Sequence, residues 1–276
     1  MKIGIVGLGL MGGSLGLALK KISTKYNLLG YDHNPSHKRD ALRLKLVDAI
    51  TEDFDEIKHC DVIILTIPVD AIISISQTLT DISSHCTVID FGSSKEKISK
   101  AIPASIRTNF VTSHPMTGTE KFGPTAAVEG LYDEKTMVIC DIEQSNDYQK
   151  GVALSIFKDI NAKIVFMDAK EHDRHAAFIS HMPHAVSFAL AKSVMEQQDP
   201  KSILALAGGG FKSMSRIAKS SANMWEDIFR QNKDNLLESI EAFNQEMALC
   251  QKLIEEENWE ELHSWMTEAN KLHEIL

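Results

Sequence analysis

Gly7-Leu8-Gly9-Leu10-Met11-Gly12 follows the apolar run Lys2–Val6 and opens the helical pattern Met11–Lys21. Between a strand and a helix, a G-x-G-x-x-G run is typical of dinucleotide binding. Its first glycine permits a tight turn, its second lets the backbone approach a pyrophosphate, and its third lets the helix pack on the strand. The helix N-terminus then offers unpaired N–H groups to the phosphates. We predict that this run binds a dinucleotide; a glycine-rich turn without a ligand is the alternative.

The choice of dinucleotide depends on Asp32, which ends the next predicted strand 20 residues after Gly12. A carboxylate at this place accepts hydrogen bonds from an adenosine ribose and repels a 2′-phosphate. Asp32 therefore favours NAD over NADP. His33, Lys38 and Arg39 are basic residues close to Asp32 in the sequence, and basic side chains could bind a 2′-phosphate. NADP therefore stays open as the alternative.

The chain as far as residue 168 alternates short β-rich runs with amphipathic helical patterns. The predicted strands are Lys2–Val6, Tyr26–Tyr31, Asp61–Ile67, Thr87–Phe91, Asn109–Ser113, Thr136–Ile142 and Lys163–Met167. The predicted helices between them include Met11–Lys21, Pro35–Leu46, Val69–Leu79 and Lys95–Ile102. The run Val62–Leu65 is apolar on both faces, as a central parallel strand covered by helices requires. Repeated βαβ units predict an α/β fold with a Rossmann-type doubly wound sheet.

The second part of the chain has a different pattern. No glycine follows Gly210 and no proline follows Pro200, so the final stretch contains no strong helix breaker. Residues 211–276 are therefore expected to be helical. We predict two domains: a dinucleotide-binding domain at 1–168 and an all-helical domain at 169–276.

Composition narrows the possible partners and compartments. The formal net charge is −9, so an acidic surface argues against nucleic acid and against an anionic membrane. The four cysteines are far apart and form no metal spacing, which predicts free thiols in a reducing compartment. The uncharged N-terminal stretch is too rich in glycine for a signal peptide. We expect a cytoplasmic protein.

Polar side chains stand where three predicted strands end. Thr66-Ile67-Pro68, Gly92-Ser93-Ser94-Lys95 and Ser113-His114-Pro115 mark these ends. Ligands of a doubly wound sheet bind beyond the carboxyl ends of its strands, so Thr66 and Pro68 are predicted to contact the cofactor. The alternative for Ser93 or Ser94 is to cap the helix that follows.

His114 is the candidate catalytic base. Hydride transfer from a carbon that carries a hydroxyl group needs an acceptor for the hydroxyl proton. A neutral imidazole, with an ordinary pKa of about 6.5, suits this role near neutral pH. The alternative is a structural histidine before a turn.

The helical part contains a second polar set. Ser180-His181-Met182-Pro183-His184 interrupts a helical pattern, and a glycine triplet at 208–210 permits unusual backbone geometry before Arg216. Arg216 could bind a carboxylate through two parallel hydrogen bonds, or it is a solvated surface residue. His172 and His175 are spaced as a metal-binding pair, but no third ligand completes a zinc motif, so we predict no metal. Their role stays open.

Together these segments resemble the prephenate dehydrogenase family, which includes arogenate and cyclohexadienyl dehydrogenases. The resemblance extends over nearly the whole chain in order and spacing. The most specific segments are His114-Pro115-Met116-Thr117-Gly118-Thr119-Glu120 and Ser180–His184. The other matching segments are Gly7–Ser14, Gly92–Lys95, Phe211–Ala218 and Met224–Phe229.

The resemblance implies a fold, a reaction and a set of site residues. It implies an N-terminal Rossmann domain and a helical domain that forms a homodimer. The implied reaction is oxidative decarboxylation of prephenate to 4-hydroxyphenylpyruvate with reduction of NAD, on the route to tyrosine. By position, His114 matches the catalytic histidine, Ser93 the serine that orients it, and Arg216 the anchor of a substrate carboxylate. The remaining pocket positions are His184, His181, Thr119, Glu120 and Trp225.

Three alternatives stay open at this point. Arogenate differs from prephenate only in its side chain, and no single residue decides between the two substrates. A β-hydroxyacid dehydrogenase shares the glycine turn, but it needs a helix lysine with an asparagine four residues later. In this chain the candidate lysine is Lys212, and Arg216 stands in the place of the asparagine. A non-catalytic dinucleotide sensor is the third possibility, although it has no need of His114, Ser93 and Arg216 together.

Overall fold

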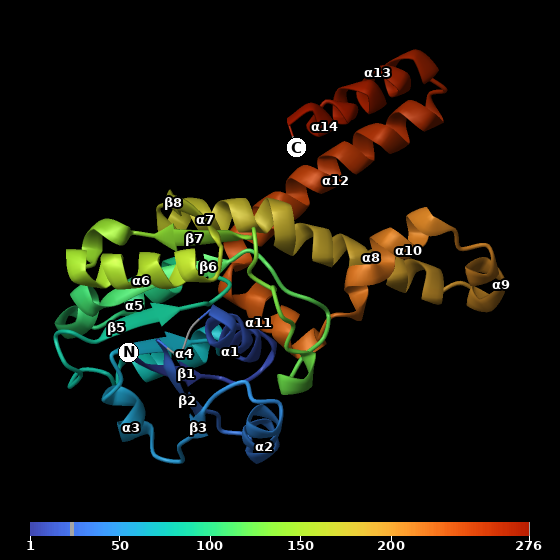
Figure 1. The fold of residues 1–276 in the computed structure, drawn as a ribbon. Coiled ribbons are helices and arrows are strands. Elements are labelled where there is room, and N and C mark those ends of the chain that lie inside the picture. The colour runs from blue at the N-terminus through green and yellow to red at the C-terminus, as the bar shows by residue number, and fades with distance from the viewer. Residues whose placement is uncertain (23–24, 276) are drawn as a thin grey trace.

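The computed structural model describes residues 1–22 and 25–275, and these residues contain one eight-stranded sheet with the order β3-β2-β1-β4-β5-β6-β7-β8 (Figure 1). The strands are β1 (Lys2–Val6), β2 (Asn27–Tyr31), β3 (Ala49–Ile50), β4 (Val62–Leu65), β5 (Thr87–Asp90), β6 (Phe110–Pro115), β7 (Thr136–Cys140) and β8 (Lys163–Met167).

The first six strands are parallel. The chain adds β2 and β3 on one side of β1 and then β4, β5 and β6 on the other side. Their order is that of a doubly wound sheet whose direction of winding reverses between β1 and β4. β4 is buried along its whole length, as its apolar residues on both faces predict. The predicted α/β fold with a Rossmann-type sheet is therefore confirmed. The reversal opens a crevice at the carboxyl ends of β1 and β4, where a ligand can bind.

Two features of the sheet were not predicted. β3 is a two-residue edge strand, and β7 pairs antiparallel with β6, with β8 parallel to β7. The described segment between β6 and β7 contains only a short 3₁₀ turn, Pro124–Ala126, in place of a crossover helix. Without a crossover the chain returns along the edge of the sheet, which gives an antiparallel pair.

Helices cover both faces of the sheet. On one face α1 (Leu10–Ile22) and α6 (Asp147–Asp159) bury Leu15, Leu19 and Phe157 against β1 and β5. On the other face α3 (Phe54–Lys58), α4 (Val69–Ser76) and α5 (Glu96–Ala101) form a second core. α2 (Pro35–Arg43) lies beside β3. The two cores fix the strand ends that carry the polar side chains.

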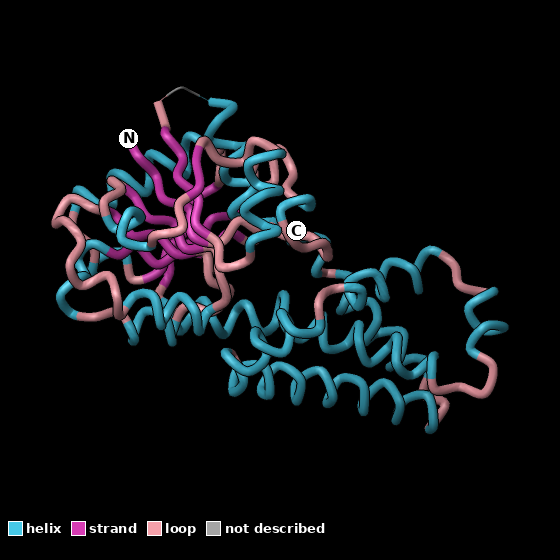
Figure 2. The backbone as a smooth tube through the Cα atoms, turned by 90° about the horizontal axis from the view of Figure 1, so that it is seen from below, coloured by secondary structure: helices cyan, strands magenta, loops and turns pink. Residues whose placement is uncertain are grey.

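The chain after β8 is helical. Its helices are α7 (Ala169–Ala176), α8 (Met182–Met195), α9 (Pro200–Ala205), α10 (Gly209–Ser215), α11 (Ala222–Gln231), α12 (Lys233–Glu255), α13 (Trp259–Asn270) and α14 (Leu272–Ile275). In Figures 1 and 2 the pair α12–α13 projects from the sheet as one arm, and α8 leads into a second arm with α9 and α10. Within the described residues, the helices predicted for 211–276 are present, apart from a 3₁₀ turn at Arg216–Lys219 and short joints.

Two local predictions for the helical part need correction. The segment Ser180–His184 does not break the helix; a π-helical turn at Ala177–His181 joins α7 to α8. Pro183 explains the turn because it has no N–H to donate and its ring pushes the backbone of the preceding turn away. The glycine triplet at 208–210 has no positive φ, and a Cβ there would meet open space among the described residues. Its special conformational freedom is not used in this structure.

The helical part packs on the sheet through α7 and α11. The Asp173 carboxylate of α7 accepts backbone N–H groups of Lys95 and Glu96 at the start of α5, at 2.7 and 3.0 Å. On α11, Arg230 lies 2.7 Å from Asp70 of α4. These contacts bring helical side chains to the polar edge of the sheet.

The four cysteines lie within the described residues and are free, as predicted. In the part of the chain that the structure describes, no helix combines the length and the apolar character needed to cross a membrane.

Candidate active site

The glycine turn between β1 and α1 has the geometry that a bound pyrophosphate needs. Gly7 adopts a φ of 94°, and a Cβ on Gly12 would lie 2.0 Å from the Gly7 carbonyl oxygen. In contrast, a Cβ on Gly9 would meet no atom of the described chain within 4 Å. The first and third glycines therefore allow the turn and the packing of the helix, while the backbone at Gly9 faces open space.

Asp32 ties the end of β2 to this turn. Its side chain is 5% exposed, and it accepts the backbone N–H of Leu8 at 2.8 Å. The ring Nδ1 of His37 lies 3.2 Å from the carboxylate, and that of the exposed His33 lies at 3.6 Å. Lys38 pairs instead with Glu52. The carboxylate thus lies beside the glycine turn, with the ring nitrogens of two histidines nearby.

Thr66 and Pro68 follow β4 at the same crevice. The Thr66 hydroxyl donates hydrogen bonds to the carbonyl oxygens of Gly7, at 2.6 Å, and Val6, at 3.0 Å. Pro68 is exposed just before α4. The structure thus brings Thr66 against the glycine turn.

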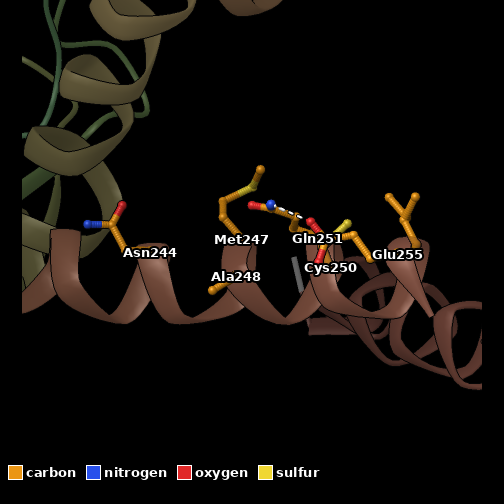
Figure 3. Close-up of a pocket in the computed structure, with 7 residues that line it drawn as sticks. Asn244, Met247, Ala248, Cys250, Gln251 and Glu255 are labelled. Atoms are coloured by element: carbon orange, nitrogen blue, oxygen red, sulfur yellow. Dashed lines mark hydrogen bonds between the residues drawn. The ribbon is translucent and has the colours of Figure 1, made fainter.

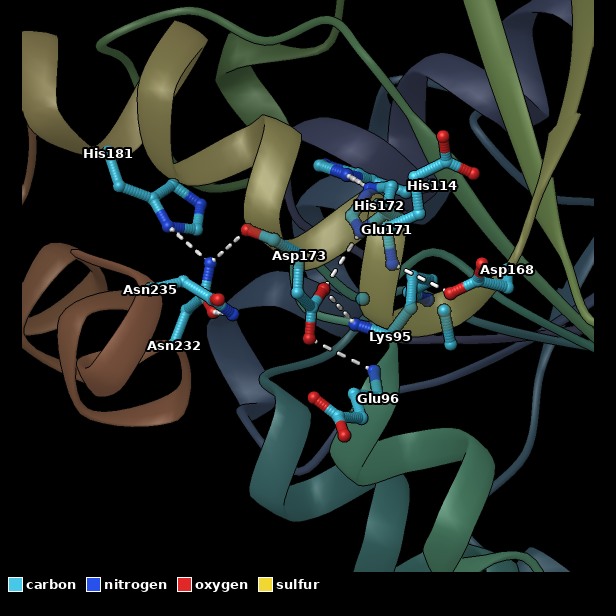
Figure 4. A network of polar contacts seen from close by, with 12 residues as sticks. Lys95, Glu96, His114, Asp168, Glu171, His172, Asp173, His181, Asn232 and Asn235 are labelled. Atoms are coloured by element: carbon cyan, nitrogen blue, oxygen red, sulfur yellow. Dashed lines mark hydrogen bonds and ion pairs between the residues drawn. The ribbon is translucent and has the colours of Figure 1, made fainter. Parts of the chain in front are cut away.

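His114 lies near the carboxyl end of β6 and faces the buried His172 of α7, which in turn contacts Asp173 (Figure 4). Its Nδ1 is 2.9 Å from Nε2 of His172, and Nδ1 of His172 is 2.8 Å from the Asp173 carboxylate. Burial lowers the pKa of His114 well below its ordinary 6.5, and His172, Lys95 and His181 lower it further. His114 is therefore neutral at neutral pH and able to accept a proton.

A buried ion pair supports the strand beneath His114. Lys95 pairs with Asp90 at the end of β5, and its Nζ donates to the Ser113 carbonyl oxygen at 2.6 Å. Asp90 also accepts the backbone N–H groups of Gly92 and Ser113. The pair thus holds both the turn that contains Ser93 and the residue before His114. Asp173, and not Ser93 or Ser94, accepts the first N–H groups of α5.

His181, His184 and Trp225 form an aromatic group on the helical side. The His184 ring stacks on Trp225 with centroids 3.5 Å apart, and His181 meets the same indole edge-on at 6.1 Å. Burial lowers the pKa of His181 to about 4, and burial likewise lowers the pKa of His184. Both rings are therefore neutral near pH 7. Asn232 of the joint between α11 and α12 contacts His181 Nδ1 at 3.1 Å.

The other predicted site residues lie on turns and loops. Ser93 is half-buried between β5 and α5, and Thr119 and Glu120 are in the loop after β6. Arg216 is exposed in the 3₁₀ turn after α10, and its charge lowers the pKa of His184.

The site contains residues that sequence reasoning missed. Asp173, Lys95 and Asn232 were not singled out for a role, and His172 had none assigned. The local signal for His172 and Asp173 is that a histidine and a carboxylate stand next to each other inside the helix that follows β8. Within the described ranges, no three His, Cys, Asp or Glu side chains group as a metal site.

Comparisons with known proteins match both parts of the chain. Residues 15–166 match the prephenate dehydrogenase nucleotide-binding domain, and residues 168–268 match the prephenate dehydrogenase dimerization domain. The chain belongs to the prephenate dehydrogenase family. The resemblance seen in the motifs is thereby confirmed. The chain is an oxidoreductase of this family and not a β-hydroxyacid dehydrogenase.

Individual relatives cover almost the full chain. It is 30% identical over 273 residues to the prephenate dehydrogenase of Bacillus subtilis strain 168, across 96% of this chain and 73% of that protein. A crystal structure of the Aquifex aeolicus prephenate dehydrogenase with hydroxyphenyl propionate and NAD+ gives a TM-score of 0.92 at 32% identity. The match covers 100% of this chain and 98% of that one. The Synechocystis arogenate dehydrogenase structure gives 0.81 at 28% identity, covering 99% of both chains.

Proposed function

We propose that this enzyme catalyses the oxidative decarboxylation of prephenate to 4-hydroxyphenylpyruvate, with NAD as the oxidant, on the route to tyrosine. The observation that carries the proposal is the neutral His114 imidazole, held by a buried hydrogen-bond network at the sheet edge that also carries the glycine turn. Family membership supports the same reaction class.

The residues around the glycine turn fit NAD. The run Gly7–Gly12, with the open backbone at Gly9, would hold the pyrophosphate, and Asp32 would bind the adenosine ribose. Thr66 and Pro68 would form the wall of the crevice. When bound, NAD supplies the acceptor for the hydride that leaves the hydroxyl-bearing ring carbon. The relative whose structure holds NAD+ supports this choice.

The protein residues divide the remaining work. His114 Nε2 accepts the proton of the ring hydroxyl, and Ser93 orients that hydroxyl and the imidazole. Arg216 binds a substrate carboxylate that the acidic protein surface would otherwise repel. His181, His184, Trp225, Thr119 and Glu120 line the pocket. Loss of the ring carboxylate as CO2 makes the ring aromatic, so the protein contributes mainly orientation and placement of charge.

Arogenate is the second candidate substrate, and the similarity to the Synechocystis arogenate dehydrogenase favours it. Its amine would replace the keto group of prephenate in the same pocket. We retain prephenate as the first choice because relatives of that name match the chain at 30–32% identity.

We also propose that the active form is a homodimer assembled through the helical domain that begins after Asp168. One face of α12, lined by residues 244–255, is open to solvent and exposes Met247 and Ile254 (Figure 3). An exposed apolar helix face of this kind is typical of a subunit interface. The match of residues 168–268 to a dimerization domain supports a second copy of this chain as its partner.

The test is formation of NADH or NADPH after mixing the purified protein with prephenate or arogenate and either cofactor. The proposal predicts rapid reduction of NAD with prephenate. A signal only with arogenate would keep the mechanism and change the substrate. No signal in any of the four mixtures would reject the enzyme and leave the dinucleotide sensor.

A further inference from the structure

His172 connects His114 to a carboxylate through a continuous series of hydrogen bonds. His114 Nδ1 lies 2.9 Å from His172 Nε2, and His172 Nδ1 lies 2.8 Å from Asp173 Oδ1. His172 and Asp173 are each 2% exposed. Figure 4 shows His172 between His114 and Asp173, with the Asp173 carboxylate next to Lys95 and Glu96. Neither residue touches the substrate in the proposed reaction.

The partners of Asp173 determine which nitrogen atoms carry protons. Its carboxylate accepts N–H groups from Lys95, at 2.7 Å, and Glu96, at 3.0 Å, so it acts as an acceptor. His172 must then hold its proton on Nδ1 and offer the lone pair of Nε2 to the neighbouring ring. His114 in turn donates from Nδ1, which leaves the lone pair of its Nε2 for the substrate hydroxyl.

We propose that His172 and Asp173 are positioning residues that fix His114 in the Nδ1–H tautomer and take up positive charge when its Nε2 accepts a proton. The charge-uptake part rests on the proposed function of His114 as the base. In that step the substrate O–H bond breaks and the Nε2–H bond forms. The proton between the two rings then moves from His114 Nδ1 to His172 Nε2, which places the charge next to the Asp173 carboxylate.

The surroundings of His114 explain why such a path is needed. Burial disfavours an imidazolium at His114 most, and His172 of α7, Lys95 just before α5 and His181 of the π-helical turn disfavour it further. The nearby carboxylate of Asp90 is engaged by Lys95. Asp173 therefore provides the compensating charge, and it contacts His172 and not His114.

The tautomer can be tested without substrate by a long-range ¹⁵N–¹H NMR spectrum of the full chain labelled with ¹⁵N-histidine. His114→Asn and His172→Gln identify the two sets of signals. We expect the Nδ1–H tautomer for His114 in the wild type and a mixture of tautomers in His172→Leu. The Nε2–H tautomer for wild-type His114 would overturn the proposal, whatever the substrate of the enzyme is.

Kinetics test the charge uptake. His172→Leu removes the acceptor for His114 and is expected to lower kcat by at least about 10- to 100-fold, the loss seen when a metal-bound histidine loses the partner that orients it, with little change in KM. His172→Gln can still accept from His114 and donate to Asp173, so it should restore the tautomer. Because glutamine takes up no proton, it should recover only part of kcat, and the acid limb of kcat/KM should move to lower pH.

His175→Leu and His175→Gln are the matched controls, since His175 is exposed on the same helix. We expect both to behave like the wild type. Wild-type kcat and an unmoved acid limb in His172→Leu would overturn the proposal. A wild-type protein that oxidises neither prephenate nor arogenate would instead reject the proposed function, while the NMR result would still decide the tautomer.

Discussion

At the scale of single residues, the chemistry depends on a neutral His114. Replacing it with asparagine removes the proton acceptor, and such acid–base groups contribute about 10²- to 10⁴-fold in rate. We expect His114→Asn to lose turnover by a factor in this range while its affinity for NAD, measured by fluorescence titration, stays unchanged. Near-full turnover in this variant would contradict the assignment.

The pH dependence follows from the same residue. His114 acts only when neutral, so activity falls as the pH drops through its pKa. Since burial lowers that pKa well below 6.5, activity should persist to a more acidic pH than an exposed histidine would allow. A profile of kcat/KM against pH measures this directly. An acid limb at or above 6.5 would show that His114 is not the group that titrates.

Asp32 controls the choice of cofactor. In Asp32→Asn the carboxylate no longer repels a 2′-phosphate, and a charge-assisted hydrogen bond to the ribose, worth about 1.5–3 kcal/mol, is weakened. We expect the KM for NAD to rise by about tenfold and the preference over NADP to fall. The control is Asp55→Asn, at an exposed carboxylate on α3. If the ratio of kcat/KM for NAD to kcat/KM for NADP stayed unchanged in Asp32→Asn, Asp32 would not contact the cofactor.

At the scale of elements, the glycine turn separates folding from binding. Gly12→Ala places a Cβ against the Gly7 carbonyl oxygen, and such overpacking costs about 1–3 kcal/mol of unfolding free energy. Gly9→Ala meets open space, so it should keep wild-type stability but obstruct the pyrophosphate and raise the KM for NAD. Thermal unfolding and NAD titration of the two variants distinguish these effects. Equal NAD affinity in Gly9→Ala and the wild type would contradict the predicted contact.

The elements that sequence reasoning predicted are those with local causes. The G-x-G-x-x-G turn, the apolar run of β4 and the position of Asp32 each depend on a few neighbouring residues. The antiparallel direction of β7 was missed because it depends on the absence of a crossover helix across the whole β6–β7 segment. The contact of His172 with His114 was missed because it depends on how α7 packs across the sheet, 58 residues away in the chain.

At the scale of the whole molecule, the exposed face of α12 should hold two subunits together. Met247→Lys places a charge on this face, and we expect it to shift the protein toward monomer in size-exclusion chromatography with light scattering. Gln245→Lys is the control, because it adds the same charge about 200° around the same helix. A dimer that tolerates Met247→Lys as well as the control would place the interface elsewhere.

The proposed reaction is tested most directly by measuring NADH and CO2 together as they form from prephenate and NAD, in the wild type and in His114→Asn. We expect equal amounts of both products from the wild type, and a large loss of both in the variant although NAD still binds. NADH without CO2, no NADH at all, or equal rates in the two proteins would contradict the proposed reaction.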